Sequence, residues 1–244
     1  MKLIVNYYTI FKIKLYRKIV RFLTTRTPNI KLIDILEKNF AKNKSEFCVI
    51  IVGANDGISH DFLYDFMINK NVVGIAIEPS LDIFNKLKNN FSIFPNIKLI
   101  NKAVHPDKKE VILYRVDPLK YNQLPDWCNG IGSLFSEYHE KLAIDKKNII
   151  EETVKADSLM NIFSEVEFSN RSIDLLQIDT EGFDFEIIKL IEFKKYHPKI
   201  IKYEYIHLTS QEQHDSITLL KHQGYICFSE GNDMLAIDLT KIKL

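Results

Sequence analysis

The chain has 244 residues, of which 46% are hydrophobic, so its length suits one α/β domain with a modest extension. Its 33 basic and 32 acidic residues leave a net charge of +1, which excludes a strong overall attraction to nucleic acid, and we expect no nucleic-acid partner. The three cysteines include no close pair, which argues against a disulfide framework or a zinc cluster and favours a cytoplasmic location.

The first 28 residues form the one basic patch of the chain, with seven Lys or Arg side chains and no acidic one. Lysines interrupt the apolar run there, so it predicts neither a membrane-spanning helix nor a signal peptide. Phe11, Leu15 and Ile19 recur at helical spacing with basic residues between them. Such a helix can cover its own domain, lie on the inner face of an anionic membrane or join two copies of the chain in a homo-oligomer. We predict a basic helical N-terminal extension at residues 1–45.

A further helix is predicted from Ile30 to Phe40, and the polar stretch after it ends the helix. From Phe47 onward, apolar runs of strand length alternate with amphipathic segments, which is typical of a parallel sheet with crossover helices. The last two apolar runs flank a Gly-Asn-Asp turn and predict a hairpin. We therefore predict an α/β domain over residues 46–244: a Rossmann-like, doubly wound, mostly parallel sheet with a C-terminal antiparallel hairpin. The predicted strands are 47–52, 72–77, 97–104, 110–116, 173–179, 198–206, 225–230 and 234–239, and the predicted helices are 60–69, 81–90, 183–194 and 211–222.

Residues 117–155 interrupt this alternation with a polar and aromatic stretch. A long connection without strong periodicity is often a lid or a binding loop, although surface elaboration is as common. Trp127, Tyr138 and His139 within it either line a substrate pocket or pack the stretch onto the body. We predict that these residues form an insertion over the functional edge of the sheet.

The segment VGANDG joins the first strand of the domain to the next helix. Gly53, Asn55 and Gly57 lie in this turn, at the carboxyl end of the strand, where ligands bind in such sheets. The helix that follows offers free N–H groups that suit a carboxylate or a phosphate. Glu78 ends the second strand, where an acid can accept hydrogen bonds from both hydroxyls of a ribose. No Gly-x-Gly-x-x-Gly pattern is present, which disfavours a dinucleotide, so we predict a single nucleoside cofactor with a carboxylate tail.

Several motifs together resemble the FkbM family of methyltransferases: VIIVGANDG, AIEPS, NKAV, GSL, DSL and, above all, LLQIDTEGFDFEII. The resemblance covers about residues 47–239, with Gln177 where the family usually has Lys. It implies a class I methyltransferase fold and O-methylation of a sugar or nucleotide-sugar in surface polysaccharide biosynthesis. It also implies S-adenosyl-L-methionine as the cofactor, bound by Gly53, Asn55, Gly57 and Glu78, with Ala103 and Val104 beside the adenine.

Two acids at the ends of neighbouring predicted strands form a candidate catalytic pair. Asp179 ends the fourth core strand, Glu204 ends the fifth, and His207 follows three residues later. Methyl transfer to a hydroxyl requires a base or a metal ion opposite the methyl donor. We expect either that Asp179 or His207 is the base, or that Asp179, Glu204 and His207 bind a divalent ion such as Mg²⁺ or Mn²⁺. Alternatively, Asp179 caps the next helix and Glu204 pairs with a lysine.

We expect the acceptor to contact Ser133, in the family-like Gly-Ser-Leu segment, and Glu204. Glu181, beside Gly182 at the start of a helix, has a structural explanation as an acid that stabilises the helix dipole. Two other functions stay open: an NAD(P)-dependent oxidoreductase, and a non-catalytic scaffold domain that keeps the fold.

Overall fold

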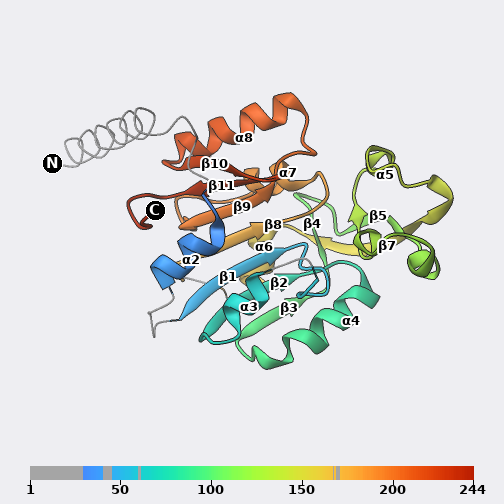
Figure 1. Ribbon diagram of the computed structural model, residues 1–244, viewed down its shortest axis with the longest axis horizontal. Coiled ribbons are helices and arrows are strands. Elements are labelled where there is room, and N and C mark those ends of the chain that lie inside the picture. The colour runs from blue at the N-terminus through green and yellow to red at the C-terminus, as the bar shows by residue number, and fades with distance from the viewer. Residues whose placement is uncertain (1–29, 41–45, 60–61, 167, 169–170) are drawn as a thin grey trace.

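The computed structural model of the protein describes residues 30–40, 46–59, 62–166, 168 and 171–244. In this part of the chain, helices cover both faces of a central sheet, and a smaller sheet extends to one side (Figure 1). The basic helix predicted within residues 1–28 lies outside the described residues. No described helix is long and apolar enough to cross a membrane.

The central sheet has seven strands in the order β10-β11-β9-β8-β1-β2-β3. The strands β3, β2, β1, β8 and β9 are parallel, whereas β11 is antiparallel to β9, and β10 to β11. This confirms the predicted doubly wound, mostly parallel sheet with its C-terminal hairpin. The strands are β1 (Phe47–Val52), β2 (Val72–Ile77), β3 (Ile97–Ile100), β8 (Leu175–Ile178), β9 (Ile200–Glu204), β10 (Ile226–Glu230) and β11 (Asp233–Ile237).

Both faces of the central sheet are buried. Every residue of β1 and of β2 is buried, which is why these strands are continuous apolar runs and not alternating ones. One face packs on α6, α7 and α8, and the other packs on α2, α3 and α4. These helices are α2 (Leu32–Phe40), α3 (Leu63–Met67), α4 (Leu81–Asn90), α6 (Leu159–Glu165), α7 (Asp184–Lys189) and α8 (Ser210–His222), and a 3₁₀ helix, Phe91–Ile93, follows α4.

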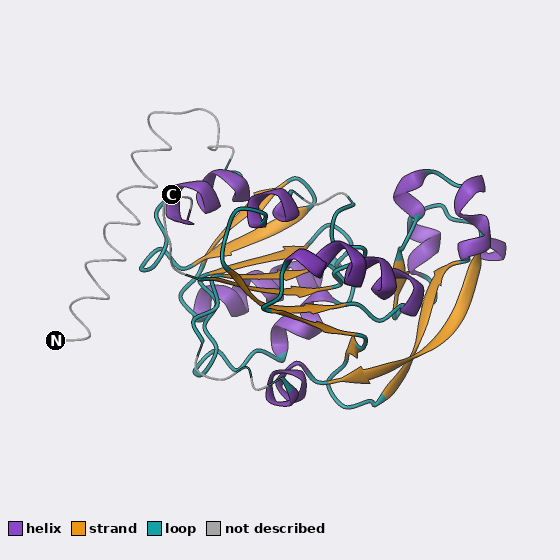
Figure 2. Cartoon of the chain, turned by 90° about the horizontal axis from the view of Figure 1, so that it is seen from below, coloured by secondary structure: helices purple, strands orange, loops and turns teal. Residues whose placement is uncertain are grey.

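Residues 110–157, called the arm below, project from the body (Figure 2). The arm consists mainly of two antiparallel strands, β5 (Glu110–Val116) and β7 (Ile149–Asp157). The short strands β4 (Ala103–Val104) and β6 (Gly132–Ser133) extend them into a second sheet, in the order β4-β7-β5-β6. Between β5 and β7 lie α5 (Tyr138–Lys141) and the 3₁₀ helices Pro118–Gln123, Asp126–Cys128 and Lys146–Asn148.

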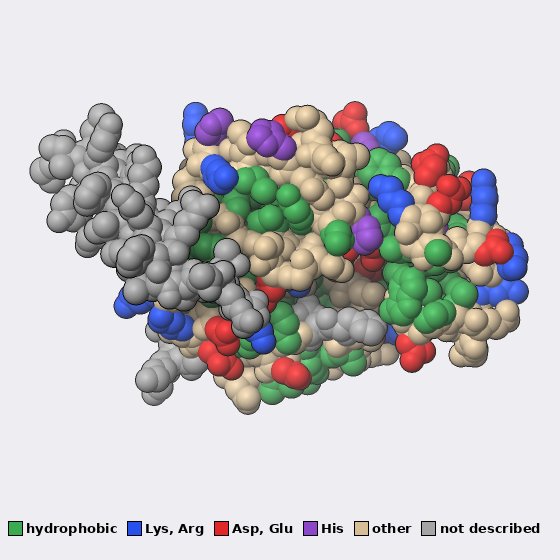
Figure 3. Space-filling model, turned by 45° about the horizontal axis from the view of Figure 1, so that its top comes forward, with side chains coloured by type: hydrophobic (Ala, Val, Ile, Leu, Met, Phe, Trp, Pro, Cys, Tyr) green, Lys and Arg blue, Asp and Glu red, His purple; other side chains and the backbone are tan. Residues whose placement is uncertain are grey.

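Most of the strand β7 lies within the range 117–155 that we predicted as an insertion without regular periodicity, and its last two residues extend beyond that range. Only Val154 and Ala156 are buried in this strand, so most of its sequence is polar and lacks the pattern of a covered strand. The arm also exposes large hydrophobic side chains, including Leu119 (83% exposed) and Trp127 (47%). Figure 3 shows hydrophobic side chains gathered on its right-hand side, where Figure 1 places the arm. The arm therefore has little core of its own.

The predicted strand 97–104 is divided between the two sheets. Its first half, β3, pairs with β2, whereas its second half, β4, pairs with β7. The chain turns at Asn101, whose side-chain amide donates hydrogen bonds to the carbonyl oxygens of Glu78 (3.0 Å) and Pro79 (2.8 Å). These bonds attach the start of the arm sheet to the end of β2.

The strand order reverses beside β1. The chain runs outward through β1, β2 and β3 and then returns to β8 on the other side of β1. In open α/β sheets, this reversal opens a crevice at the carboxyl ends of the two strands that flank it. A ligand site is therefore expected at the ends of β1 and β8.

Candidate active site

A pocket of about 690 Å³, which includes space open to solvent, lies at the carboxyl ends of β1, β2 and β8. Residues of the arm complete its wall. Five of the six residues predicted to bind the cofactor line this pocket: Gly53, Asn55, Glu78, Ala103 and Val104.

The two glycines of the VGANDG turn differ in position. At Gly53, with a φ of +76°, a Cβ atom would lie 1.7 Å from the carbonyl oxygen of Asp179, so only glycine lets the ends of β1 and β8 approach this closely. Gly57 is the predicted cofactor residue that does not line the pocket. A Cβ atom there would lie 2.3 Å from the ring of Phe91. Gly57 therefore allows the turn to pack on the end of α4.

Glu78 connects the turn after β1 to the end of β2. Its side chain is 6% exposed, and its two oxygens accept hydrogen bonds from the backbone N–H groups of Asn55 (3.0 Å) and Ser80 (2.9 Å). Burial raises the pKa of Glu78 to about 7, although both N–H groups and the nearby charge of Arg115 oppose the rise. Each carboxylate oxygen can accept a second hydrogen bond. The side chain therefore fits a ligand that presents two hydroxyl groups.

Three acids meet at the ends of β8 and β9. Asp179 follows β8, Glu181 lies in the turn before α7, and Glu204 ends β9. One carboxylate oxygen from each of the three lies within 4.8 Å of the other two. Asp179 and Glu181 also line the pocket. The predicted convergence of Asp179 and Glu204 is therefore present, and Glu181 joins them.

Tyr138, from α5 of the arm, lies against this acid cluster, which we define as Asp179, Glu181 and Glu204. Its hydroxyl donates a hydrogen bond to Glu181 and lies 3.3 Å from Oε2 of Glu204. The predicted third residue, His207, is at the other side of Glu204, with Nε2 3.5 Å from Oε1, and its ring meets that of Tyr138 edge-on at 5.3 Å. His207 therefore borders the cluster through Glu204.

Burial and mutual repulsion change how the cluster titrates. Burial, followed by the charge of Asp179, raises the pKa of Glu181 to about 8. Burial, followed by the charges of Glu181 and Asp179, raises the pKa of Glu204 to about 9. Burial and the charge of Lys141 lower the pKa of His207. The cluster consequently holds protons near neutral pH unless a cation replaces them.

Asp184 holds the backbone of this region in place. It is fully buried, and its Oδ2 accepts hydrogen bonds from the hydroxyl of Thr180 (3.0 Å) and the N–H of Gly182 (3.3 Å). Its Oδ1 accepts one from the N–H of Glu204 (3.1 Å). Because the two oxygens bind the turn after β8 and the end of β9, Asp184 fixes the spacing between Glu181 and Glu204.

Ser133, predicted to contact the acceptor, is fully buried. Its hydroxyl donates to the carbonyl oxygen of Glu181 (2.7 Å) and accepts from the N–H of Phe135 (3.2 Å). Through these two bonds, Ser133 attaches the arm to the turn that carries Glu181.

The sequence did not identify Glu181 and Asp184 as parts of the site, and it left open whether Tyr138 lines a pocket or packs the arm onto the body. The sequence suggests that Glu181 stabilises a helix dipole. In the structure its φ of +54° is not helical, and Glu181 lies in the turn before α7 begins at Asp184. The sequence offers one local signal, the glycine at 182, which indicates an unusual backbone turn beside Glu181. Tyr138 meets Glu181 across 43 residues of chain, and nothing in the local sequence predicts that contact.

The fold and the pocket fit a Rossmann-like enzyme that binds a nucleoside cofactor: a crevice lies at the strand reversal, with a buried acid suited to ribose hydroxyls. The family model described as "Methyltransferase FkbM domain" matches residues 52–227. The chain therefore belongs to the FkbM methyltransferase family, and the predicted resemblance is confirmed. Membership implies S-adenosylmethionine as the cofactor and favours methyl transfer over the oxidoreductase and scaffold alternatives.

Comparison with solved structures gave methyltransferase structures of low similarity. A methyltransferase FkbM from Methylobacillus flagellatus KT is 11% identical, with a TM-score of 0.47 over 81% of this chain and 45% of that one. The METTL16 methyltransferase domain is 14% identical, with a TM-score of 0.45 over 84% of this chain and 66% of that one. A fibrillarin from Methanococcus jannaschii is 14% identical, with a TM-score of 0.40 over 80% and 67%. This chain therefore covers less than two thirds of the length of the FkbM methyltransferase and of the METTL16 domain. Among curated proteins, none matched.

Proposed function

We propose that this protein transfers a methyl group from S-adenosylmethionine to a hydroxyl group of a sugar or nucleotide-sugar used in surface polysaccharide. The observation that carries this proposal is the position of Asp179 and Glu181, which line the same pocket as Glu78. A hydroxyl that enters this pocket is thereby brought next to the carboxylate of Asp179, which can take its proton. When bound, S-adenosylmethionine supplies an electrophilic methyl group.

The cofactor end of the pocket would be formed by the carboxylate of Glu78 and the turn at Gly53 and Asn55. Glu78 has acceptor capacity for the ribose hydroxyls, because each of its oxygens receives one backbone N–H. Ala103 and Val104 are apolar, buried and part of the pocket wall, which suits the face of a nucleobase.

The acceptor class rests on the family resemblance and on an aromatic surface beside the acids. Phe135 is 43% exposed, and its ring lies 5.8 Å from that of Phe183, which lines the pocket. The ring of Phe135 also lies against Gly182, next to Glu181. Exposed aromatic faces of this kind pack well on the apolar face of a sugar ring.

Two versions of proton removal are compatible with these positions. In the first, Asp179 accepts the hydroxyl proton directly. In the second, Asp179, Glu181 and Glu204 bind a Mg²⁺ or Mn²⁺ ion, which would lower the pKa of the bound hydroxyl. The second version replaces the predicted ligand His207 with Glu181, because His207 reaches the cluster only through Glu204.

Two measurements test the proposed reaction. Calorimetry should show that S-adenosylhomocysteine binds and NADH does not; binding of NADH alone would contradict a methyltransferase. Incubation of the protein and S-adenosylmethionine with a panel of nucleotide-sugars should give a product heavier by one methyl group, detected by mass spectrometry. If nucleotides and proteins are methylated instead of any sugar, the acceptor class is wrong.

The metal version is tested by removal and replacement of the ion. Dialysis against a chelator should abolish turnover, and Mg²⁺ or Mn²⁺ should restore it. Glu204→Gln should weaken Mn²⁺ binding, measured by electron paramagnetic resonance, whereas Glu186→Gln, at an acid that pairs with Lys189, should leave it unchanged. If turnover survives the chelator and no metal copurifies, Asp179 is the direct base.

A further inference from the structure

The arm supplies part of the pocket wall. Leu113 of β5, Gly132 of β6, and Gly130 and Leu134 on either side of β6 all line the pocket. The arm also packs closely on the VGANDG turn after β1, since a Cβ atom on Gly130 would lie 2.7 Å from Oδ1 of Asn55. The pocket is therefore complete only while the arm stays against the body.

A buried arginine holds the arm in this position. Arg115 lies two residues after Leu113, so both side chains point to the same face of β5. Although charged, Arg115 is only 3% exposed. Its guanidinium forms a bidentate pair with Asp82, with N–O distances of 2.5 and 2.8 Å, and also binds Glu152 (2.8 Å) and donates to the hydroxyl of Tyr121 (3.0 Å). Bidentate pairs of this kind are strong and geometrically specific.

The three partners of Arg115 differ in where they lie. Glu152 and Tyr121 belong to the arm itself, whereas Asp82 belongs to the first turn of α4 in the body. The segment before α4 carries Glu78, whose Oε1 accepts the N–H of Ser80. The Arg115–Asp82 pair therefore joins the arm to the segment that carries Glu78, the acid proposed to bind the ribose of the cofactor.

The strand β6, which pairs with β5, attaches the arm to the turn that carries Glu181 of the acid cluster. In the β5–β6 register, Arg115 pairs with Gly132, and Tyr114 pairs with Ser133. The hydroxyl of Ser133 donates to the carbonyl oxygen of Glu181. The β5–β6 pair thus reaches from the Glu78 side of the pocket to the Glu181 side and is attached at both.

We propose that Arg115 is a positioning residue for the cofactor. Its bidentate ion pair with Asp82 keeps the arm against the pocket and thereby sets the dissociation rate of the cofactor. This inference rests on the proposed location of the cofactor in this pocket. Arg115 itself does not line the pocket, and its effect passes through Leu113 and the strand pair.

The Arg115–Asp82 pair could also act on Glu78 through charge alone, and the two explanations predict opposite changes in cofactor affinity when the charge of Asp82 is removed. The charge of Arg115 lowers the pKa of Glu78, and the charge of Asp82 raises it. If the pair acted on Glu78 through charge alone, removing the charge of Asp82 would favour ionised Glu78 and tighten binding. If the pair acts by holding the arm, the same change loosens binding.

The test compares two substitutions that each remove one carboxylate from Arg115. Asp82→Asn, on the body, should raise the dissociation rate and the Kd of S-adenosylhomocysteine about tenfold, the effect of losing one charge-assisted hydrogen bond. Glu152→Gln, within the arm, should change both by less than about twofold. Asp82→Glu keeps the carboxylate and should restore most of the affinity. Stopped-flow and calorimetry give the two constants, and thermal unfolding confirms that each variant is folded.

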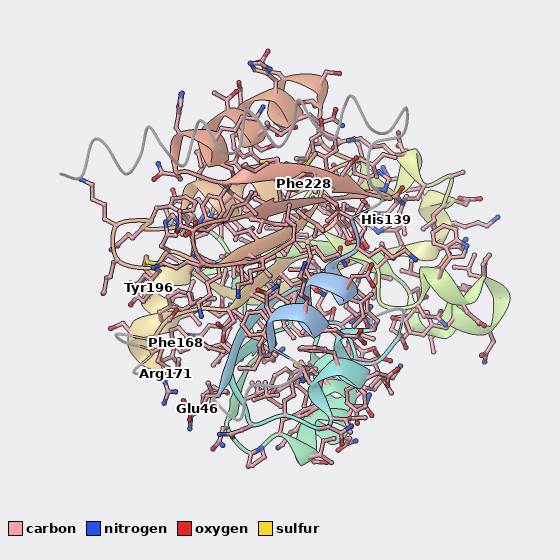
Figure 4. The ribbon with its side chains drawn as sticks, turned by 60° about the vertical axis from the view of Figure 1, so that its left-hand side comes forward. Glu46, His139, Phe168, Arg171, Tyr196 and Phe228 are labelled. Carbon is pink, nitrogen blue, oxygen red and sulfur yellow. The ribbon has the colours of Figure 1, made fainter. Side chains whose placement is uncertain are left out.

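A distant pair provides a further control. Glu46→Gln breaks the 2.8 Å ion pair with Arg171, which Figure 4 shows on the opposite side of the molecule from His139 of α5. This variant should bind S-adenosylhomocysteine as the unchanged protein does. Unchanged or tighter binding by Asp82→Asn, or an equal loss in Glu152→Gln, would overturn the role of Arg115. Normal binding by Glu78→Ala would instead show that the cofactor lies elsewhere.

Discussion

Glu78 combines a structural role and the proposed binding role in one carboxylate. Its bonds to the N–H groups of Asn55 and Ser80 hold the turn after β1 against the end of β2. The remaining acceptor capacity of the same oxygens faces the pocket that Glu78 lines. The side chain is thus placed before any ligand arrives, which lowers the entropic cost of binding.

Replacement of Glu78 should affect the cofactor strongly. Glu78→Ala should weaken S-adenosylhomocysteine binding by about 1–3 kcal/mol, because the ribose hydroxyls lose their acceptor and enter a buried wall unpaired. Calorimetry measures this loss. Glu110→Ala, at an exposed acid of β5, is the matched control and should bind normally. Unchanged affinity in Glu78→Ala would remove Glu78 from the site.

The same residue should make cofactor binding depend on pH. The pKa of Glu78 is raised to about 7, and hydroxyl donors prefer the ionised carboxylate. S-adenosylhomocysteine affinity should therefore fall as the pH drops through about 7, approaching tenfold for each further unit. Glu78→Gln cannot titrate and should flatten this dependence. If the two proteins lose affinity in parallel between about pH 8 and about pH 6, another group is responsible.

Asp179 should separate binding from chemistry. It lines the pocket beside Thr180 and Glu181, on the proposed acceptor side. Asp179→Asn keeps the size of the side chain but can neither accept a proton nor bind a divalent ion strongly, so turnover should be lost while S-adenosylhomocysteine binds nearly as before. A variant that still methylates an acceptor at the normal rate would exclude both versions of the mechanism.

At the scale of elements, the turn between β8 and α7 determines the geometry of the acids. Glu181 has a φ of +54° and Gly182 one of +101°, and these positions are held by Asp184 and Ser133. Neither holding residue lines the pocket. The arrangement of the acids therefore depends on buried side chains that lie outside the pocket lining.

Loss of Asp184 should damage stability more than the loss of an exposed acid on the same helix. Asp184→Ala leaves the N–H groups of Gly182 and Glu204 without their acceptor and should lower the free energy of unfolding by about 2–4 kcal/mol. Urea unfolding measures this change. Glu186→Ala, which loses only a pair with Lys189 at the helix surface, should cost less than about 1 kcal/mol. Equal effects would mean that Asp184 does not hold the turn.

Elements whose burial is encoded locally were predictable from the sequence. The predicted bounds of β1, β2, α4 and β5 match the structure, since their apolar pattern reflects the surface that they bury. The strand β7 was not predictable, because it forms by pairing with β5 and buries little. The same reason explains the site: Gly53, Asn55 and Glu78 lie at strand ends along the sequence, whereas Tyr138 reaches Glu181 only through the fold of the arm.

At the scale of the whole molecule, buried acids concentrate at one edge of the sheet. The pKa values of Glu78, Glu181, Asp184 and Glu204 are all raised, in each case chiefly by burial. At the ends of β8 and β9, the charge of Asp179 repels those of Glu181, Asp184 and Glu204, and burial has removed water from these carboxylates. The ionised acids therefore lower the stability of the ligand-free protein. Binding of a proton, a cation or a hydroxyl-bearing ligand reduces this loss of stability.

The cofactor-free and metal-free protein should consequently become more stable on mild acidification. The pKa of Glu204 is about 9 when folded, against 4.5 for an ordinary glutamate, so the folded chain takes up protons as the pH falls while the unfolded chain does not. This stabilisation grows from about pH 9 to about pH 5 and is lost again as the pH rises through the folded values. Thermal unfolding with a chelator present measures it. Glu204→Gln should reduce the slope above about pH 7, and a steady loss of stability between about pH 9 and about pH 6 would contradict the prediction.

The paired ends of the arm have a consequence for how enzymes of this build can diversify. Glu110 of β5 lies opposite Lys155 of β7, so the chain leaves the body and returns to it at neighbouring points. The stretch between them can be exchanged for another of different length without rerouting the central sheet, much as domains are inserted between adjacent termini. A transplanted arm must still bring a cation to Asp82 and a hydroxyl to Glu181, and within those two constraints the part of the pocket wall that the arm supplies is free to change.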